Sequence, residues 1–188
     1  HIDVVMFDKT GTLTEGRPSV TDMTLSIESL ALVASLEASS EHPLATAVVR
    51  YAKDKGIALK TADQVKSITG KGIEGVVDGK KVVVGSPKHV ATSGPGGPLM
   101  AQVETWQEQG KTVVVALADD QLLGVLAIAD AAKPTAKAAV AELKRMGREV
   151  VMVTGDNRRT AEAIARESGI DQIEAEVLPG TKLEVVKA

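Results

Sequence analysis

The stretch VVMFDKTGTLTEG, residues 4–16, decides the fold and frames the question of function. An apolar run ends at Asp8, and the chain then becomes polar, with several threonines and glycines. A continuous apolar run predicts a strand that is covered on both faces, as in a parallel sheet. Ligands of open α/β sheets bind where the strands end. The sequence therefore predicts that Asp8 stands at the rim of a buried strand, beside a ligand site.

The C-terminal part of the chain continues this pattern. EVVMV (149–153) is a second apolar strand, and a polar turn follows it. KPTAKAAVAELKRMG (133–147) has the proline and the glycine expected at the two ends of a helix, and NRRTAEAIARESG (157–169) is helical again. IEAEVLP (173–179) is predicted as a further short strand with its exit turn. This β-α-β-α order predicts a doubly wound parallel α/β sheet.

The middle of the chain predicts a different architecture. Two helices, 27–40 and 42–56, precede short strand-like runs in which Asp78-Gly79 is a hairpin signal, and a long hairpin follows at 112–130. Antiparallel strands with helices indicate an α+β module. We expect this module to be inserted into the α/β domain, with the crossing points near residues 20 and 128. The predicted domains are residues 1–20 with 128–188 for the α/β domain and residues 21–127 for the insertion.

The composition excludes several classes of function. The net charge is −3, and Phe7, Tyr51 and Trp106 are the only aromatic residues, so a nucleic-acid groove is not expected. The absence of cysteine excludes disulfides and thiolate metal sites. No signal peptide and no apolar run of membrane-spanning length is recognised, so the chain as given is expected to be soluble and compatible with the cytoplasm.

Two strand ends are expected to share one crevice, because Asp156 follows the second strand as Asp8 follows the first. Their backbone N–H groups could bind an anion such as phosphate. A carboxylate there can act as a nucleophile and form an acyl phosphate, although an aspartate can equally cap a turn. The side chains that would add hydrogen-bond donors or positive charge are Thr10, Thr12, Thr154, Lys9 and Lys182.

The run DKTGTLT (8–14) resembles the phosphorylation motif of the P-type ATPases, ion pumps of the haloacid-dehalogenase superfamily. MVTGDN (152–157) is similar to the second signature of that family. The resemblance implies a haloacid-dehalogenase-like fold with an inserted nucleotide-binding domain, and it implies that ATP phosphorylates Asp8. Mg²⁺ would be held by the Asp8 carboxylate and the Thr10 carbonyl. The remaining catalytic positions implied are Lys9, Thr154, Gly155, Asp156 and Lys182, with Thr154 binding the transferred phosphoryl group and Lys182 neutralising it.

SEHPLA (40–45) resembles the nucleotide-binding motif of the heavy-metal-transporting branch, in which Glu41 and His42 would orient adenine. Read from the residues alone, it can also be a plain helix start. The Gly-x-Gly-x-x-Gly pattern of GKGIEG (70–75) is not a dinucleotide fingerprint, because a strand-like run follows it instead of a helix. Its glycines would allow close nucleotide approach or merely a hairpin bend. The further nucleotide-binding positions that the resemblance implies are Gly70, Gly72, Ile73, Gly85 and Ser86, the last standing where the branch has asparagine.

Thr10 bears on the choice between a pump and a phosphatase. Soluble phosphatases of the superfamily commonly carry a second aspartate two residues after the nucleophile, where it protonates the leaving group and activates water. Threonine cannot do this near neutral pH. The phosphoenzyme is therefore expected to persist, as the conformational cycle of a pump requires. Asp130 and Lys133 fall where the family tends to have Asp-x-x-Lys, so that Asp130 would line the hinge or start a helix.

The resemblance implies the ATP-binding and phosphorylation unit of a heavy-metal pump, with Cu(I) favoured, in the cell membrane. ATP and Mg²⁺ would be its cofactors. Its partners would be the membrane helices and actuator domain, with the transported ion bound elsewhere and no nucleic acid involved. A pump for Zn²⁺, Cd²⁺ or Co²⁺, a soluble phosphatase with a cap domain, and a non-catalytic nucleotide-binding module stay open. The family's next strand, ending in Gly-Asp-Gly-x-Asn-Asp, is absent, so we expect this piece to bind ATP but to phosphorylate Asp8 poorly or not at all.

Overall fold

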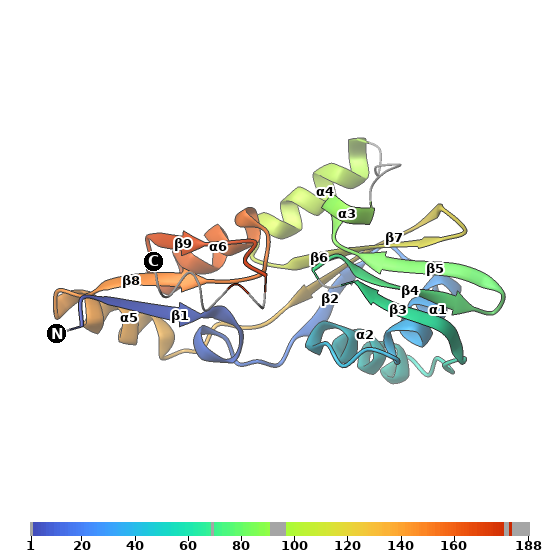
Figure 1. Cartoon of the computed structure of the whole chain (residues 1–188), viewed down its shortest axis with the longest axis horizontal. Coiled ribbons are helices and arrows are strands. Elements are labelled where there is room, and N and C mark those ends of the chain that lie inside the picture. Colours follow the sequence, from blue (N-terminus) through green and yellow to red (C-terminus); the bar gives the residue numbers. More distant parts are fainter. Residues whose placement is uncertain (1, 69, 91–96, 179–180, 182–188) are drawn as a thin grey trace. The chain divides into compact units, whose positions relative to one another are not determined.

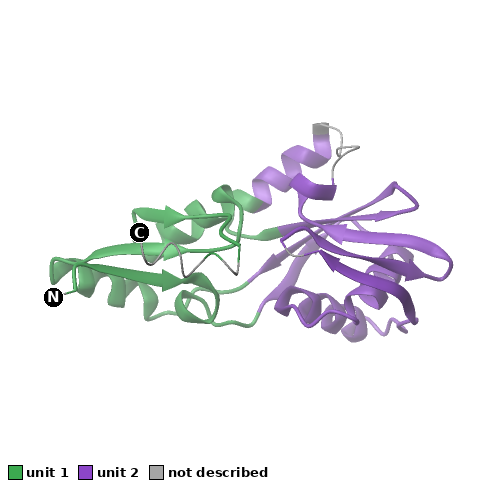
Figure 2. Ribbon diagram, in the orientation of Figure 1, with its two compact units in different colours: residues 1–17, 107–112, 130–188 green, residues 18–106, 113–129 purple. Residues whose placement is uncertain are grey.

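The computed structural model describes residues 2–68, 70–90, 97–178 and 181, and Figure 1 shows the order of its helices and strands. The chain divides into two compact units, coloured separately in Figure 2. Unit 1 comprises residues 1–17, 107–112 and 130–188, and unit 2 comprises residues 18–106 and 113–129. The units change close to the expected crossing points, and unit 1 also takes in a segment, 107–112, that the sequence analysis had placed in the insertion.

Unit 1 is built on a three-stranded parallel sheet of order β1-β8-β9. The strands are β1 (Val4–Asp8), β8 (Glu149–Val153) and β9 (Gln172–Glu174). Helix α5 (Ala136–Arg145) precedes β8, and helix α6 (Arg158–Ser168) connects β8 to β9. This arrangement confirms the predicted β-α-β-α order, because α5 leads into β8 and α6 connects β8 to its parallel neighbour β9.

One hydrophobic cluster holds unit 1 together. Val150 and Met152 alternate along β8 and are almost fully buried, as expected for one face of a strand. Val140 of α5 and Ile164 of α6 belong to the same cluster, so both helices cover this face of the sheet. Asn157 caps α6 by accepting a hydrogen bond from the Thr160 N–H at 2.8 Å.

Unit 2 contains a six-stranded antiparallel sheet of order β2-β7-β6-β5-β4-β3. Its strands are β2 (Ser19–Met23), β3 (Ala62–Ile68), β4 (Gly72–Val77), β5 (Lys80–Gly85), β6 (Thr112–Ala118) and β7 (Gln121–Ala129). Its helices are α1 (Ile27–Glu37), α2 (Pro43–Asp54), α3 (Pro87–Val90) and the greater part of α4 (Gly97–Glu108).

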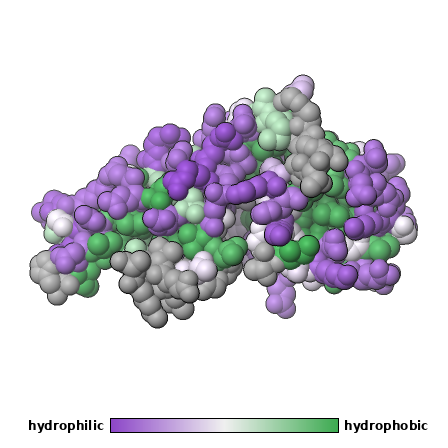
Figure 3. Space-filling model, turned by 45° about the horizontal axis from the view of Figure 1, so that its top comes forward, coloured by the Kyte–Doolittle hydropathy of each residue, from purple (hydrophilic) through white to green (hydrophobic). Residues whose placement is uncertain are grey.

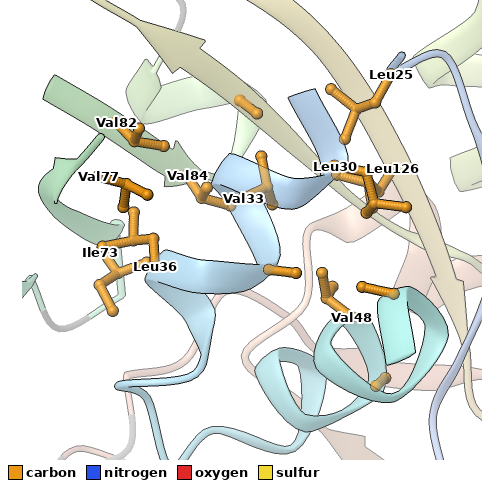
Figure 4. Close-up of a cluster of buried hydrophobic side chains, with 14 of the residues drawn as sticks. Leu25, Leu30, Val33, Leu36, Val48, Ile73, Val77, Val82, Val84 and Leu126 are labelled. Atoms are coloured by element: carbon orange, nitrogen blue, oxygen red, sulfur yellow. The ribbon is translucent and has the colours of Figure 1, made fainter. Parts of the chain in front are cut away.

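The two faces of this sheet bury different clusters, because side chains alternate along each strand. Along β7, Leu126 and Ile128 join the cluster under α1 and α2, whereas Val125 and Ala127 join a second cluster. Figure 4 shows the first cluster, in which Val33 of α1 lies over the strand residues. The second cluster contains Val103 and Trp106 of α4 together with residues of β6 and β7.

The predicted α/β class with an antiparallel insertion is confirmed. One strand, β2, was not predicted, because its sequence SVTDM lacks a regular alternation of polar and apolar residues, and it is stabilised by pairing with β7. The last strand, β9, covers Gln172–Glu174, near the start of the stretch 173–179 that was predicted as a short strand with its exit turn. The hairpin predicted at Asp78-Gly79 is present, and both residues have positive φ, +56° and +75°, as its turn requires.

Hydrophilic side chains cover much of the face drawn in Figure 3, and hydrophobic ones form smaller patches. Among the residues that the structure describes, no helix has the length and apolar character needed to cross a membrane.

Candidate active site

The sheet edge of unit 1 brings together the two motif loops. β1 pairs in parallel with β8, and the register sets Asp8 opposite Val153. Both strands end at the same edge, so Asp8 and Thr154 begin the two turns there. Because β1 and β8 are hydrogen-bonded to each other, the two turns are neighbours, as predicted. Asp8 is exposed at this rim.

The turn after Asp8, η1 (Lys9–Leu13), is irregular. Thr10 has extended dihedral angles, φ −73° and ψ 123°, and Gly11 has φ +76°. This conformation sends the backbone away from the strand direction directly after the carboxylate. The Lys133 ammonium holds it by donating to the Gly11 carbonyl at 2.8 Å.

Lys9 and Asp156 connect the two motif loops. The Lys9 Nζ lies 2.5 Å from Asp156 Oδ2, and the two side chains are only 10% and 15% exposed. Asp156 Oδ1 also accepts a hydrogen bond from the Thr112 hydroxyl at 3.2 Å. Lys9, whose positive charge was predicted to attract an anion, thus forms an ion pair with Asp156 of the second motif. Lys9 is fixed at the rim by this pair.

Thr154 and Gly155 form the turn after β8. The Thr154 side chain is 3% exposed, and its oxygen accepts a hydrogen bond from the Asp156 N–H at 3.1 Å. The hydroxyl proton therefore remains available to donate. Gly155 is exposed, and a Cβ there would lie 3.3 Å from the Val177 carbonyl oxygen. Lys182 lies outside the described residues.

Asp130 does not begin a helix, because α5 starts at Ala136. Its carboxylate accepts hydrogen bonds from the Thr14 hydroxyl at 2.6 Å and from the Arg17 N–H at 3.0 Å. The backbone N–H of Lys133 donates to the Leu13 carbonyl at 2.8 Å. We call the residues 11–17 and 130–133 joined by these bonds the loop clasp. It ties the end of the first motif to the chain segment that returns to unit 1.

The oxygen ligands at the rim provide only part of a Mg²⁺ site. Mg²⁺ prefers hard oxygen ligands and usually combines one or two carboxylates with waters and substrate phosphates. The Asp8 carboxylate and the Thr10 carbonyl are ligands of this kind. Over the described residues, no cluster of three or more histidine, cysteine or acidic side chains could hold a metal by itself. The site therefore suits an ion that arrives with phosphate oxygens.

Unit 2 contains a cavity of about 520 Å³, which we call the base cavity. Volumes of about 300–1,000 Å³ are typical of small-molecule sites. Glu41, His42 and Ile73, all predicted for nucleotide binding, line it. The other described lining residues are Ser39, Ser40, Val65 and Ser67.

His42 has a defined local role as the cap of α2. Its Nδ1 accepts a hydrogen bond from the Leu44 N–H at 3.2 Å, and its own N–H donates to Ser40 Oγ at 3.2 Å. Because Nδ1 accepts, the neutral imidazole carries its proton on Nε2. Glu37 supports the same loop, since its carbonyl accepts from the Ser40 N–H at 2.9 Å. Burial raises the pKa of the Glu37 carboxyl to about 7.

The predicted glycines do not gather around the base cavity. Gly72 and Gly85 are register partners in β4 and β5, and a Cβ on Gly72 would lie 2.1 Å from the Val84 carbonyl oxygen. Close strand packing thus explains this pair. Gly72 and Ile73 also line a smaller cavity of about 90 Å³. Gly70 has φ +72°, and Ser86 Oγ is buried with no hydrogen-bond partner among the described residues.

Several residues of these sites were missed from the sequence. Thr14 closes the DKTGTLT motif, and its place in the motif was the available signal. Thr112 lies far from the motifs along the chain, and its contact with Asp156 depends on how distant segments meet. Ser67 lies three residues before Gly70, and its place beside Ile73 depends on the register of β3 and β4.

Comparisons with known proteins agree with this geometry. A copper-exporting P-type ATPase of Staphylococcus epidermidis is 43% identical over 187 residues, which is 97% of this chain and 23% of that protein. The chain thus spans about a quarter of the length of the curated relatives it matches.

Two solved structures are also similar. One is the catalytic domain of the CPx-ATPase CopB-B, studied for conformational changes upon nucleotide binding, with a TM-score of 0.79 and 27% identity over 100% of this chain and 66% of that chain. The other is a zinc-transporting PIB-type ATPase in its E2.Pi state, with a TM-score of 0.64 and 36% identity over 98% of this chain and 31% of that chain.

A family model described as haloacid dehalogenase-like hydrolase matches residues 2–188. This is nearly the whole chain, including both motif loops and the insertion between them. The paired strand ends, the aspartate at the first of them and this match lead to one conclusion: the chain belongs to the haloacid dehalogenase-like hydrolases.

Proposed function

We propose that this chain is the ATP-binding and phosphorylation unit of a P-type ATPase that exports Cu(I). The observation that carries the proposal is the direct pairing of β1 with β8, which places the Asp8 loop and the Thr154 turn at one sheet edge. Lys9 forms an ion pair with Asp156 across the two loops, and this pair links the two motifs at the rim. Unit 1 would be the phosphorylation domain, and unit 2, with the base cavity, would bind the nucleotide.

In the proposed reaction, a carboxylate oxygen of Asp8 attacks the γ-phosphorus of ATP. The new O–P bond forms as the bond from the γ-phosphorus to the β,γ-bridging oxygen breaks, and ADP leaves with that oxygen. Asp8 is exposed at the strand end. The Thr154 N–H already donates to the Glu174 carbonyl at 2.9 Å, so the Thr154 hydroxyl and the Gly155 N–H would be the donors to the transferred group. Mg²⁺ bound at Asp8 and the Thr10 carbonyl would neutralise phosphate charge.

Thr10 supports a pump over a phosphatase. It occupies the position from which a general acid would act, and its hydroxyl cannot supply a proton near neutral pH. The aspartyl-phosphate would therefore wait for other parts of the protein to activate water. We infer that these parts are an actuator domain and membrane helices, and that this chain lies on the cytoplasmic side of a membrane.

Copper is proposed over zinc because the curated relatives that are 43–47% identical to this chain are copper-exporting or probable copper-transporting ATPases. None of the residues at the rim or in the base cavity explains ion choice. Transport and ion selectivity therefore belong to the longer protein.

The test uses the full-length protein that carries this segment and ATP labelled at the γ-phosphate. We expect acid-stable, hydroxylamine-sensitive labelling that depends on Cu(I) and disappears in Asp8→Asn. Asp171→Asn, an exposed carboxylate of the same unit, is the control and should label normally. Labelling that survives Asp8→Asn would contradict the proposal. Rapid release of phosphate from small phosphate esters without any metal dependence would favour the phosphatase. Labelling that depends on Zn²⁺ instead of Cu(I) would make Zn²⁺ the transported ion.

A further inference from the structure

Segment 107–112, which we call the α4–β6 turn, runs from the end of α4 to the first residue of β6. It belongs to unit 1 together with both motif loops, as the colouring of Figure 2 shows. Its last residue, Thr112, donates from its hydroxyl to Asp156 Oδ1 at 3.2 Å, although the two residues are 44 positions apart. The turn thus contacts the ion pair of Asp156 with Lys9 that links the two motif loops.

The α4–β6 turn is anchored on α6, the helix that begins directly after the second motif. Thr160, which is 1% exposed, donates from its hydroxyl to the Lys111 carbonyl at 2.9 Å. Arg159 donates to the side-chain oxygen of Gln107 at 3.0 Å. Because Lys111 directly precedes Thr112, these bonds fix the backbone from which the Thr112 hydroxyl reaches the second motif.

The Thr112 hydroxyl controls how the Asp156 carboxylate is turned. The last torsion of an aspartate side chain has a broad energy profile, so one partner alone leaves the carboxylate free to rotate. Here the two oxygens have different partners, since Oδ1 accepts from Thr112 and Oδ2 lies 2.5 Å from Lys9 Nζ. An ionised carboxylate only accepts hydrogen bonds, so Thr112 is the donor. Partners on both oxygens fix the plane of the carboxylate and the direction in which it holds Lys9.

The position of Lys9 matters because of its neighbours in the chain. It stands between Asp8, the proposed nucleophile, and Thr10, whose carbonyl is a proposed Mg²⁺ ligand. In the other loop, the Asp156 N–H donates to the Thr154 hydroxyl oxygen at 3.1 Å. Phosphoryl transfer depends mainly on positioning, and a displacement of about 1 Å can slow a reaction about a hundredfold. A residue that orients the ion pair therefore acts on the geometry of both loops.

We propose that Thr112 is a positioning residue for the phosphoryl transfer to Asp8. Its hydroxyl orients the Asp156 carboxylate, which in turn fixes Lys9 and with it the first motif loop. Thr112 itself touches neither ATP nor the transferred group. This inference rests on the proposed function, since it takes Asp8 as the residue that ATP phosphorylates. Loss of the hydroxyl should slow the transfer without weakening nucleotide binding, because the described lining of the base cavity belongs to unit 2.

The test measures the rate of Asp8 labelling by γ-labelled ATP in the full-length protein that carries this segment. Thr112→Val keeps the shape of the side chain and suits a strand, but it removes the hydroxyl. At saturating ATP this variant should label roughly ten- to a hundredfold more slowly than the wild type. Its affinity for a β,γ-imido analogue of ATP should change less than about twofold, because only transfer is affected. Thr112→Ser keeps the donor and should label within about threefold of the wild-type rate.

Thr105→Val serves as the matched control. Thr105 is an exposed threonine of α4, and its hydroxyl donates to the Ala101 carbonyl of the same helix at 2.9 Å. This variant should label at the wild-type rate. The amount of analogue bound at saturation counts the folded molecules, so each rate is expressed per bound nucleotide. Partial unfolding of a variant is then not mistaken for slow transfer.

Equal labelling rates of Thr112→Val and wild type per bound nucleotide would overturn the inference alone. A serine variant as slow as the valine variant would also overturn it, because the hydroxyl would then not be the group that acts. A loss of analogue affinity as large as the loss of rate would place the effect on nucleotide binding and overturn it too. A wild-type protein whose labelling does not depend on Asp8 would overturn the proposed function together with this inference.

Discussion

Glu37 is a carboxyl group that the fold keeps away from water. Its side chain is 8% exposed, and burial raises its pKa from 4.5 to about 7. The folded state therefore holds a proton that the unfolded state has already released between these two values. Stability should fall as the pH rises through this window, since the folded state binds more protons there.

The variant Glu37→Gln should remove this pH dependence. At pH 5 the variant and the wild type should have similar free energies of unfolding. At pH 8 the variant should be more stable by up to roughly 3 kcal/mol, at about 1.4 kcal/mol per pKa unit. Urea unfolding at both pH values measures this. A difference between the two proteins that stays constant with pH would show that Glu37 does not titrate as inferred.

Thr14 is the residue through which the loop clasp holds the first motif. Its side chain is fully buried, its hydroxyl donates to Asp130, and its oxygen accepts from the Gly11 N–H at 3.2 Å. Thr14→Val keeps the shape but leaves the Asp130 carboxylate without this donor. We expect a loss of about 2–3 kcal/mol in the free energy of unfolding, typical of a hydrogen bond to a charged group.

Thr14→Ser keeps the hydroxyl and is the comparison for this variant. It should lose less stability than Thr14→Val, because only a methyl group is removed. Denaturant unfolding of both proteins distinguishes the hydroxyl from the packing of the side chain. If the serine variant proved the weaker of the two, packing would be the main role of Thr14.

At the scale of elements, the close pairing of β4 with β5 depends on two glycines, Gly72 and Gly85. Gly72 has φ +145°, and a Cβ there would lie 2.1 Å from the Val84 carbonyl oxygen and 2.6 Å from Gly85 Cα. Backbone atoms cannot move aside as a flexible side chain can. Gly72→Ala should therefore destabilise unit 2 by about 3 kcal/mol or more, in the range of severe backbone strain.

Gly79→Ala provides the matched control. Gly79 also has a positive φ, +75°, but a Cβ there would meet nothing within 4 Å. Its substitution should cost only about 1 kcal/mol, from backbone conformation alone. Thermal unfolding of both variants separates contact from conformation. Equal losses would indicate that the β4–β5 packing adjusts to a side chain.

At the scale of the whole molecule, each unit has hydrophobic clusters of its own, and the described lining of the base cavity belongs to unit 2. Nucleotide should therefore stabilise unit 2 selectively. At ATP concentrations 100 times the dissociation constant, the expected gain is about 2.7 kcal/mol. Hydrogen exchange should show added protection in β3, β4 and the loop before α2. Equal added protection in β1 and β8 would contradict this assignment.

The sequence by itself determined the fold class, the main strands and helices, and the position of Asp8 at a strand end. These follow from local properties: continuous apolar runs, helix caps and a motif of seven adjacent residues. The caps at Ser26 and Asn157, for instance, need only their own next few residues.

The tertiary structure decided the rest. It recruited Thr112 to Asp156, joined Thr14 to Asp130, and set Ser67 beside Ile73. It also showed that Gly72 packs closely against β5, while its predicted nucleotide contact stays a prediction. The physical reason is that these partners are distant in sequence or fixed by strand register. Hydrophobic periodicity reports which face of an element is buried, but only the completed sheet fixes which side chains meet across it.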